Sequence, residues 1–229
     1  MFTLAWGNEL MQLVSQSDIM TKFVLLVLLF LSIFCWGIFF YKLALIRIKE
    51  RHIKKIKKAL KEAKNFNDVR EIAARFAHTI PGYMLTKNIA FIKQVLESKP
   101  VDDTLTQNDL EYVDDHIFQT IDELMQAETS YLTVLSTSAA VSPLLGLFGT
   151  VWGLIHAFVS ISQQQTADIV TIAPGIAEAL ITTLAGLMVA VPALIAYHFL
   201  HQKARAIEYH YMYIADTLRL QVKRFLVKG

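Results

Sequence analysis

The chain has 229 residues, of which 54% are hydrophobic and 18% are charged. Soluble domains carry about 25% charged residues, so the composition favours a membrane protein, and the apolar content excludes a disordered chain. The single cysteine, Cys35, excludes a disulfide framework and a multi-cysteine metal site. The net charge of +2 indicates no polyanionic partner, and no nucleic-acid binding is expected.

The 22 Lys and Arg residues are gathered in blocks along the chain. Lys22 stands alone, fifteen lie from Lys42 to Lys99, and six lie from Lys203 to Lys228. None lies between Lys99 and Lys203. Charged and apolar segments therefore alternate, which is typical of a membrane protein with several spans.

The first apolar segment, residues 23–41, has 19 residues without a charge. A helix needs about 20 apolar residues to cross the hydrocarbon core, so we expect a first transmembrane helix over residues 22–42. A cleaved signal peptide is the alternative. It fits badly, because the preceding residues 1–21 contain Glu9 and Asp18 instead of a basic region, and no small-x-small site follows.

Two further spans are predicted in the second half of the chain. Residues 129–167 contain no charge, which is too long for one crossing, and residues 169–202 contain only Glu178. We predict a second transmembrane helix over 132–162, a short loop over 163–168 and a third helix over 169–200. The short loop makes the two helices a hairpin.

The distribution of cations predicts the orientation, because cytoplasmic segments are enriched in Lys and Arg. The cation-free residues 1–21 and the loop 163–168 are expected outside, in the periplasm. The cytoplasmic segments are then the region 43–131 and the tail 201–229, which contain the basic blocks.

The cytoplasmic region is predicted to be helical, with apolar stripes at helical spacing. Its basic part, 42–64, either forms a solvated helix face or binds anionic lipid headgroups. Its acidic part, 102–128, has nine carboxylates but no calcium-loop pattern, and is expected to continue into the second span as one long helix and to pack near the basic part. The tail continues the third span. The stripes are Ile46, Ile53, Ile56, Leu60 and Ala63; Val113, Ile117, Ile121, Leu124, Leu132 and Leu135; and Ile207, Tyr211, Ile214, Leu218, Val222 and Phe225.

Small and polar residues form one stripe along each helix of the predicted hairpin. Small residues allow helices in lipid to approach closely, so packing alone explains the glycines and alanines. A threonine hydroxyl has either a role of its own or simply a hydrogen bond to its helix backbone. The stripes are Ser138, Ser142, Gly146, Thr150, Gly153 and Ala157 in the second span, and Gly175, Ala179, Thr183, Gly186 and Ala190 in the third.

Glu178 is the one charged residue within the two spans of the hairpin. A carboxylate there costs roughly 2.5–3.5 kcal/mol on insertion scales, and such residues commonly mark ion pathways. A hydrated vestibule residue near the outer surface is the alternative. Pro174, four residues earlier, is expected to kink the helix. No catalytic motif is present, so neither an enzyme nor a metal or cofactor site is predicted.

The hairpin carries two long motifs, residues 143–153 (PLLGLFGTVWG) and residues 173–180 (APGIAEAL). On these motifs the chain resembles the MotA/TolQ/ExbB family of bacterial inner-membrane proton-channel subunits. Within the family, His156-Ala157-Phe158 and the short outer N-terminus resemble the TolQ branch more than the ExbB branch. The three-span layout of an all-α membrane protein with helical cytoplasmic extensions also matches.

The resemblance implies a homopentamer that encloses the helices of a single-span partner, TolR-like or ExbD-like, and that works on the outer envelope through a TolA-like or TonB-like protein. It implies that Thr150 and Thr183 line the interior and that Glu178 lies in the pore. Packing and pore shaping are expected of Ser142, Gly146, Gly149, Gly153, Pro174, Gly175, Ala179 and Gly186.

Glu178 and Thr183 are roughly 140° apart on an ideal helix, so both reach one axis only if Pro174 kinks the helix; otherwise they belong to different walls. A non-conducting membrane scaffold is the alternative function.

Overall fold

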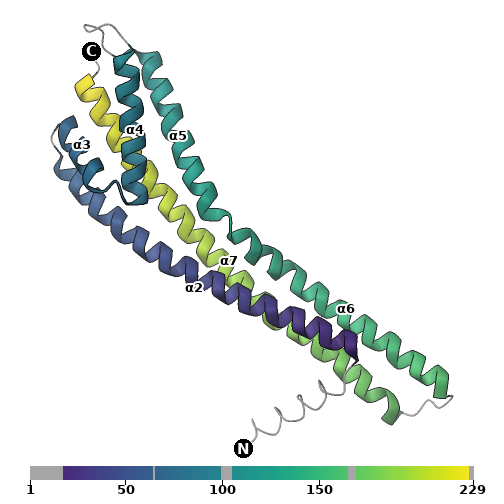
Figure 1. Ribbon diagram of the computed structural model, residues 1–229. Coiled ribbons are helices and arrows are strands. Elements are labelled where there is room, and N and C mark those ends of the chain that lie inside the picture. The colour runs from purple at the N-terminus through teal and green to yellow at the C-terminus, as the bar shows by residue number, and fades with distance from the viewer. Residues whose placement is uncertain (1–17, 64, 99–104, 165–168, 227–229) are drawn as a thin grey trace, which may run out of the picture. The chain divides into compact units, whose positions relative to one another are not determined.

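The computed structural model describes residues 18–63, 65–98, 105–164 and 169–226. Within these ranges every regular element is a helix (Figure 1). The helices are α2 (Ile19–Glu62), α3 (Phe66–Arg75), α4 (Ile80–Glu97), α5 (Gln107–Thr129), α6 (Leu132–Gln164) and α7 (Ile169–Leu226).

Three of these helices are long and apolar enough to cross a membrane, namely α2, α6 over Leu132–Ser162 and α7 over Ala173–Arg224. The prediction of an all-α protein with three membrane helices is therefore confirmed. The orientation of the termini stays a prediction. α6 extends two residues into the predicted loop, to Gln164, and α7 begins at Ile169. The rest of the loop, residues 165–168, and residues 1–17 of the N-terminal segment lie outside the described part.

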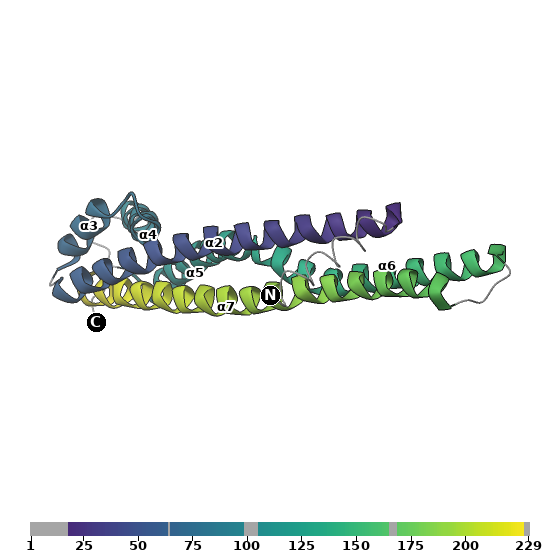
Figure 2. The same ribbon diagram turned by 90° about the horizontal axis from the view of Figure 1, so that it is seen from below.

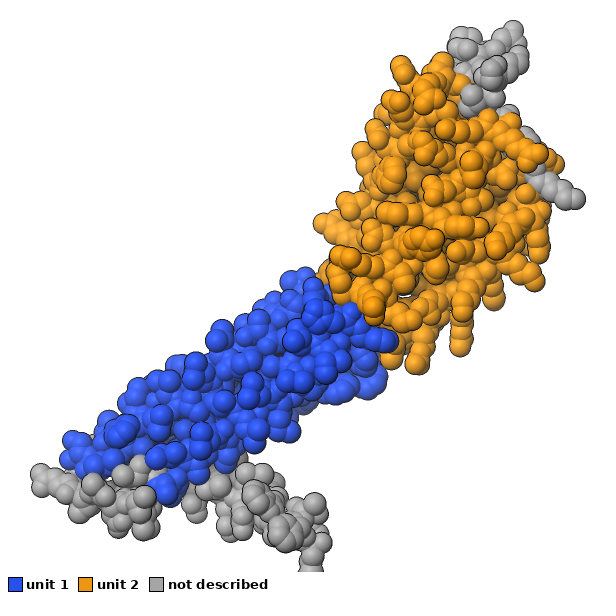
Figure 3. All heavy atoms as spheres, turned by 180° about the vertical axis from the view of Figure 1, so that it is seen from behind, with its two compact units in different colours: residues 1–40, 131–199 blue, residues 41–130, 200–229 orange. Residues whose placement is uncertain are grey.

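The chain forms two compact units, shown in different colours in Figure 3. Unit 1 comprises residues 1–40 and 131–199. Unit 2 comprises residues 41–130 and 200–229. Unit 1 thus holds the apolar segments of α2, α6 and α7, and unit 2 holds α3, α4 and α5 together with the charged ends of α2 and α7.

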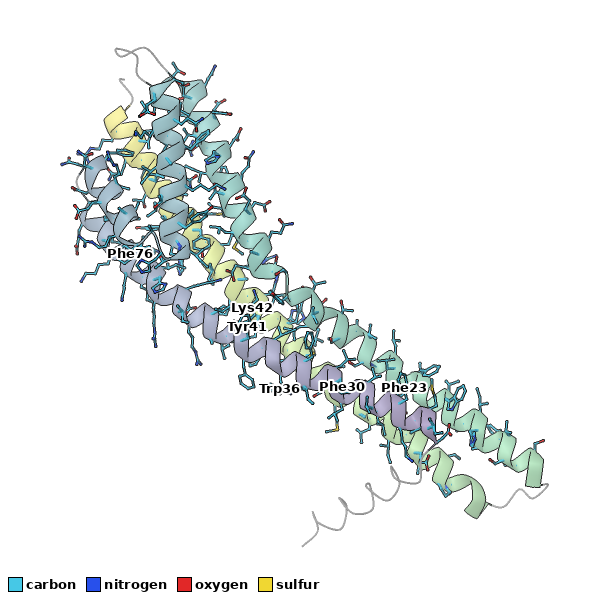
Figure 4. The ribbon with its side chains drawn as sticks, viewed as in Figure 1. Phe23, Phe30, Trp36, Tyr41, Lys42 and Phe76 are labelled. Carbon is cyan, nitrogen blue, oxygen red and sulfur yellow. The ribbon has the colours of Figure 1, made fainter. Side chains whose placement is uncertain are left out.

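In unit 1, α2 packs through one stripe of its surface. Thr21, Val24 and Leu28 are each at most 2% exposed, and Cys35 and Ile38 continue the stripe. The opposite face is apolar but exposed, as for Phe23, Phe30 and Trp36, which Figure 4 labels along this helix. Figures 1 and 2 show α6 and α7 side by side over much of the unit. Exposed apolar side chains on such a helix are suited to contact with lipid or with other membrane helices.

Unit 2 is built from helices with well-defined starts. Asn65 and Asp68 form a capping box for α3, and Thr106 and Asp109 form one for α5. At the start of α4, Thr79 Oγ1 accepts a hydrogen bond of 3.2 Å from the Gly82 amide. Side-chain caps of this kind satisfy amides that have no partner within the helix. Residues 80–82 form the first turn of α4, where proline is well tolerated.

The predicted apolar stripes form the core of unit 2. The described members from α2, α5 and α7 are almost fully buried, except that Leu124 is half-buried, as is Ala63. Leu132 and Leu135 are buried in unit 1, and the side chain of Phe225 lies outside the described part. α4 adds buried residues that were not predicted from the sequence. The core of unit 2 therefore consists of apolar side chains from four helices, α2, α4, α5 and α7. The buried members include Ile53, Ile56, Leu60, Met84, Leu85, Ile92, Val113, Ile117, Ile121, Ile207, Tyr211, Ile214 and Leu218.

The expected single helix from the acidic region into the second span is wrong, because α5 ends at Thr129 and α6 begins at Leu132. At this point Thr129 Oγ1 donates to Met125 O at 3.1 Å, and Ser130 Oγ donates to Ala127 O at 3.0 Å. The same kind of bond is made by Thr120 within α5 and by Ser142 within α6, where the helix continues, so these bonds accompany the break and do not explain it.

A buried charge cluster holds the end of α5 in place. Lys42 Nζ donates to the Glu128 carbonyl oxygen at 2.7 Å, and Lys49 Nζ forms an ion pair with the Glu128 carboxylate. All three side chains are at most 11% exposed. A cation at a helix C-terminus interacts favourably with the helix dipole and with the unpaired carbonyls there. α5 has no basic residue of its own in its last turn, so α2 supplies the cations.

Tyr211 of α7 is fully buried in the same unit, and burial raises the pKa of its hydroxyl, with the charge of Glu128 adding to the effect. The acidic helix α5 thus packs against basic residues of α2, as expected, but through Lys42 and Lys49. Further along α2, Lys57 faces α7, where its Nζ lies 3.9 Å from the centre of the Tyr213 ring.

The substitution Glu128→Gln is expected to destabilise the protein by roughly 3–5 kcal/mol, because it removes the charge of a carboxylate that forms a buried ion pair with Lys49. Thermal unfolding of the purified protein in detergent measures this loss. The matched control is Glu123→Gln, which breaks the more exposed pair between Lys87 and Glu123 and should cost about 1 kcal/mol or less. Equal effects of the two substitutions would contradict the assignment.

Candidate functional site

The helices α6 and α7 approach so closely that several positions in their contact have no room for a side chain. A Cβ added at Gly186 would lie 2.5 Å from the Ser142 carbonyl oxygen, and one at Gly146 would lie 2.8 Å from the Thr182 carbonyl oxygen. These are backbone atoms, so the neighbour cannot simply turn aside. Close contacts of this kind give helices in lipid their packing energy.

The contact continues toward the C-terminal end of α6 and the N-terminal end of α7, with small residues from each side. A Cβ at Gly153 would lie 3.0 Å from Ala179 Cβ, and one at Gly175 would lie 3.3 Å from Ala157 Cβ. The predicted packing residues Ser142, Gly146, Gly149, Gly153, Gly175, Ala179 and Gly186 therefore lie together along one hairpin contact.

Threonine hydroxyls bond across this contact. Thr182 Oγ1 donates to Gly146 O at 3.1 Å and to Ala179 O at 2.7 Å, and Thr183 Oγ1 donates to Gly146 O at 3.2 Å. Thr182 is fully buried, whereas Thr183 is half-buried. No role for Thr182 was predicted from the sequence. Its spacing offered a signal, because Thr182 lies three residues after Ala179 and four before Gly186, in register with the small-residue stripe.

Thr150 lies on the same side of the hairpin as Thr183. Thr183 packs on Gly146, since a Cβ at Gly146 would lie 2.9 Å from Thr183 Cα. Thr150 follows Gly146 by four residues, which is about one helical turn. The hydroxyl of Thr150 donates to Leu147 O of its own helix at 2.7 Å. We call this side, defined by Thr150 and Thr183, the threonine flank.

Glu178 lies on the opposite side. Thr182 follows Glu178 by about one turn and packs on Gly149, since a Cβ at Gly149 would lie 2.5 Å from Thr182 Oγ1. Trp152 follows Gly149 by three residues and lies on that same side. We call this side, defined by Glu178 and Trp152, the Glu178 flank. The contacts thus place Glu178 and Thr183 on opposite flanks of one hairpin.

Glu178 is half-buried, and none of the residues that the structure describes forms an ion pair with it. α7 passes through Pro174 as one helix, and Pro174 itself is exposed. A kink at Pro174 would lie before Glu178 and Thr183 and would move both together. Of the two arrangements considered from the sequence, the structure is therefore consistent with the one in which Glu178 and Thr183 belong to different walls.

A second carboxylate reaches the Glu178 flank from the start of α2. Asp18 Oδ2 accepts a hydrogen bond of 3.0 Å from Trp152 Nε1. This bond lowers the pKa of Asp18, burial opposes the shift, and the nearby His156 adds to the lowering. Asp18 is therefore ionised at neutral pH. This contact could not be predicted from the sequence, because its two partners are 134 residues apart.

The arrangement does not resemble a metal centre. Among the described residues, no group of three or more His, Cys, Asp or Glu side chains is placed to hold a metal ion. What the hairpin offers is a line of hydroxyls on one flank and a carboxylate without a counter-ion on the other.

These features define a class: a three-span helical membrane protein whose second and third spans form a closely packed polar hairpin. Residues 85–212 match the model of the MotA/TolQ/ExbB proton channel family. The chain belongs to this family and is accordingly an inner-membrane protein.

Relatives from both branches of the family are similar to the chain. The biopolymer transport protein ExbB of Salmonella typhimurium is 32% identical over 205 residues, which cover 84% of this chain and 80% of that protein. The Tol-Pal system protein TolQ of Haemophilus influenzae is 53% identical over 77 residues, which cover 34% of each chain. TolQ of Pseudomonas aeruginosa is 42% identical over 93 residues, which cover 41% of this chain and 40% of that protein.

The substitution Gly186→Ala is expected to destabilise the α6–α7 contact by about 1–3 kcal/mol, because the added methyl group overlaps the backbone at Ser142. Thermal unfolding of the purified protein measures the loss. Gly37→Ala is the control, since no atom lies within 4 Å of a Cβ there and alanine favours helix. A Gly186→Ala protein as stable as the parent would show that the contact is looser than described.

Proposed function

We propose that the chain is a proton-channel subunit that uses the proton motive force to drive work on the outer envelope, as a TolQ-like component of a Tol-Pal system. The observation that carries the proposal is the hairpin, with Thr150 and Thr183 on one flank and the uncompensated Glu178 on the other. A scaffold that conducts nothing needs the small residues of the contact but has no need for a costly carboxylate beside it.

The proposed assembly is a homopentamer around the membrane helices of a TolR-like or ExbD-like single-span partner. Its N-terminus lies in the periplasm, and both the region 43–131 and the tail lie in the cytoplasm, as the distribution of cations indicates. The exposed apolar faces of unit 1 support such an assembly, because they leave room for further helices or lipid.

In the proposed mechanism, protons pass along a route lined by Thr150, Thr183 and Glu178 to a carboxylate of the partner helix. Protonation removes the charge of that carboxylate and changes how it fits a polar wall. The partner then turns or shifts relative to the ring, and a TolA-like or TonB-like protein carries the movement to the outer membrane. Since Glu178 and Thr183 lie on opposite flanks, neighbouring subunits in a ring would combine the two flanks in one route.

Thr150→Ala, Thr183→Ala and Glu178→Ala are each expected to reduce proton flux about tenfold or more, because a hydrogen bond to a charged group contributes about 1.5–3 kcal/mol. The measurement is proton flux in vesicles that contain the chain and its partner. Thr137→Ala is the matched control, because Thr137 is an exposed threonine of α6, the helix that holds Thr150. Normal assembly with parental flux in all three variants would favour the scaffold.

The Tol branch is proposed on the local identity of 53% to a TolQ and on the segment His156-Ala157-Phe158. An ExbB-like subunit that energises TonB-dependent import is the second candidate, favoured by the 32% identity over 84% of the chain.

Expression in bacteria that lack TolQ or lack ExbB separates the two branches. We expect the chain to restore envelope integrity in the strain without TolQ and to leave import in the strain without ExbB unrestored. The Glu178→Ala variant serves as the inactive control in both strains. Rescue of the ExbB-deficient strain alone would assign the chain to the other branch.

A further inference from the structure

The first span reaches the Glu178 flank through the residue that precedes α2. A Cβ at Gly153 would lie 3.0 Å from Ala179 Cβ, which puts these two residues at one level along the hairpin. Trp152 precedes Gly153 and Glu178 precedes Ala179, so Trp152 and Glu178 share that level as well as that flank. A residue held by Trp152 is therefore held on the Glu178 flank.

Asp18 is that residue, and it stands immediately before α2. Its carboxylate accepts the 3.0 Å hydrogen bond from Trp152 Nε1. The following buried positions of α2 are Thr21, Val24 and Leu28, at spacings of three and four residues, so Asp18 begins the stripe by which α2 packs in unit 1. Figure 1 shows this end of α2 beside α6.

The packing beneath this bond shows what would change without it. Thr21 is 2% exposed and Val24 is 2% exposed, although both lie within two turns of the helix start. Helix ends fray unless a contact fixes them, because their first amides have no partner within the helix. The Asp18–Trp152 bond is such a contact, and it ties the helix start to the level of Glu178.

We infer that Asp18 is a positioning residue for Glu178: its hydrogen bond to Trp152 holds the outer end of the first span against the Glu178 flank and so limits the access of water to Glu178. This inference deepens the proposed function, and its importance for proton flux rests on it. The positioning itself concerns the access of water to Glu178, which can be tested without measuring proton flux.

The test measures how fast a cysteine at position 178 reacts with a water-soluble thiol reagent. The full chain is prepared with its partner in lipid nanodiscs, where the reagent reaches both faces, and carries Cys35→Ala and Glu178→Cys. Asp18→Ala is expected to raise the labelling rate roughly fivefold, which corresponds to about 1 kcal/mol for one hydrogen bond. Trp152→Phe removes the donor and should raise the rate equally, and both changes together should raise it no further.

The conservative variant Asp18→Asn separates positioning from charge. An amide oxygen still accepts a hydrogen bond from Trp152, so labelling should stay near the parental rate. A rate as high as that of Asp18→Ala would overturn the positioning role and assign the effect to the charge of Asp18.

Thr183→Cys, on the threonine flank, is the matched control for general loosening. Its labelling should not change with Asp18→Ala or Trp152→Phe. An equal increase at both positions, or no increase at position 178 with either variant, would overturn the inference. Because labelling does not depend on conduction, a chain that conducts no protons would refute the proposed function and leave this result intact.

Discussion

The absence of side chains at a few positions of the α6–α7 contact is the constraint on which unit 1 depends. Gly146 and Gly186 bring backbone against backbone, and only this proximity lets Thr182 and Thr183 reach the Gly146 carbonyl of the other helix. The same contact fixes the rotation of both helices, and hence the sorting of Thr150 and Glu178 onto opposite flanks. Packing and candidate chemistry are therefore set by one feature.

In unit 2 a buried charge network accompanies the apolar core. Glu128 sits at the end of α5, where a negative charge is unfavourable to the helix dipole, and Lys42 and Lys49 of α2 compensate it. Such a network stabilises little relative to an apolar core, but it permits few alternative arrangements once its partners are buried. It thereby specifies where α5 stops, which its apolar stripe alone leaves open.

Much of the fold was predictable from the sequence because uninterrupted apolar runs and helical spacing are local properties. The three membrane helices and the continuation of α7 into unit 2 follow from them. The end of α5 did not follow, because the lysines that contact it are distant in sequence. The spacing of Gly175 and Gly186 predicted a packing face, because that pattern is local. The Asp18–Trp152 bond was not predictable, because it joins residues that no spacing rule connects.

The hydroxyls of the threonine flank have committed their protons to carbonyl oxygens, at Leu147 for Thr150 and at Gly146 for Thr183. What they leave toward a neighbour is lone pairs, so this flank presents hydrogen-bond acceptors without free donors. A surface of that kind discriminates between the two forms of a carboxyl group. It favours the protonated form, which can donate, and disfavours the ionised form, which can only accept.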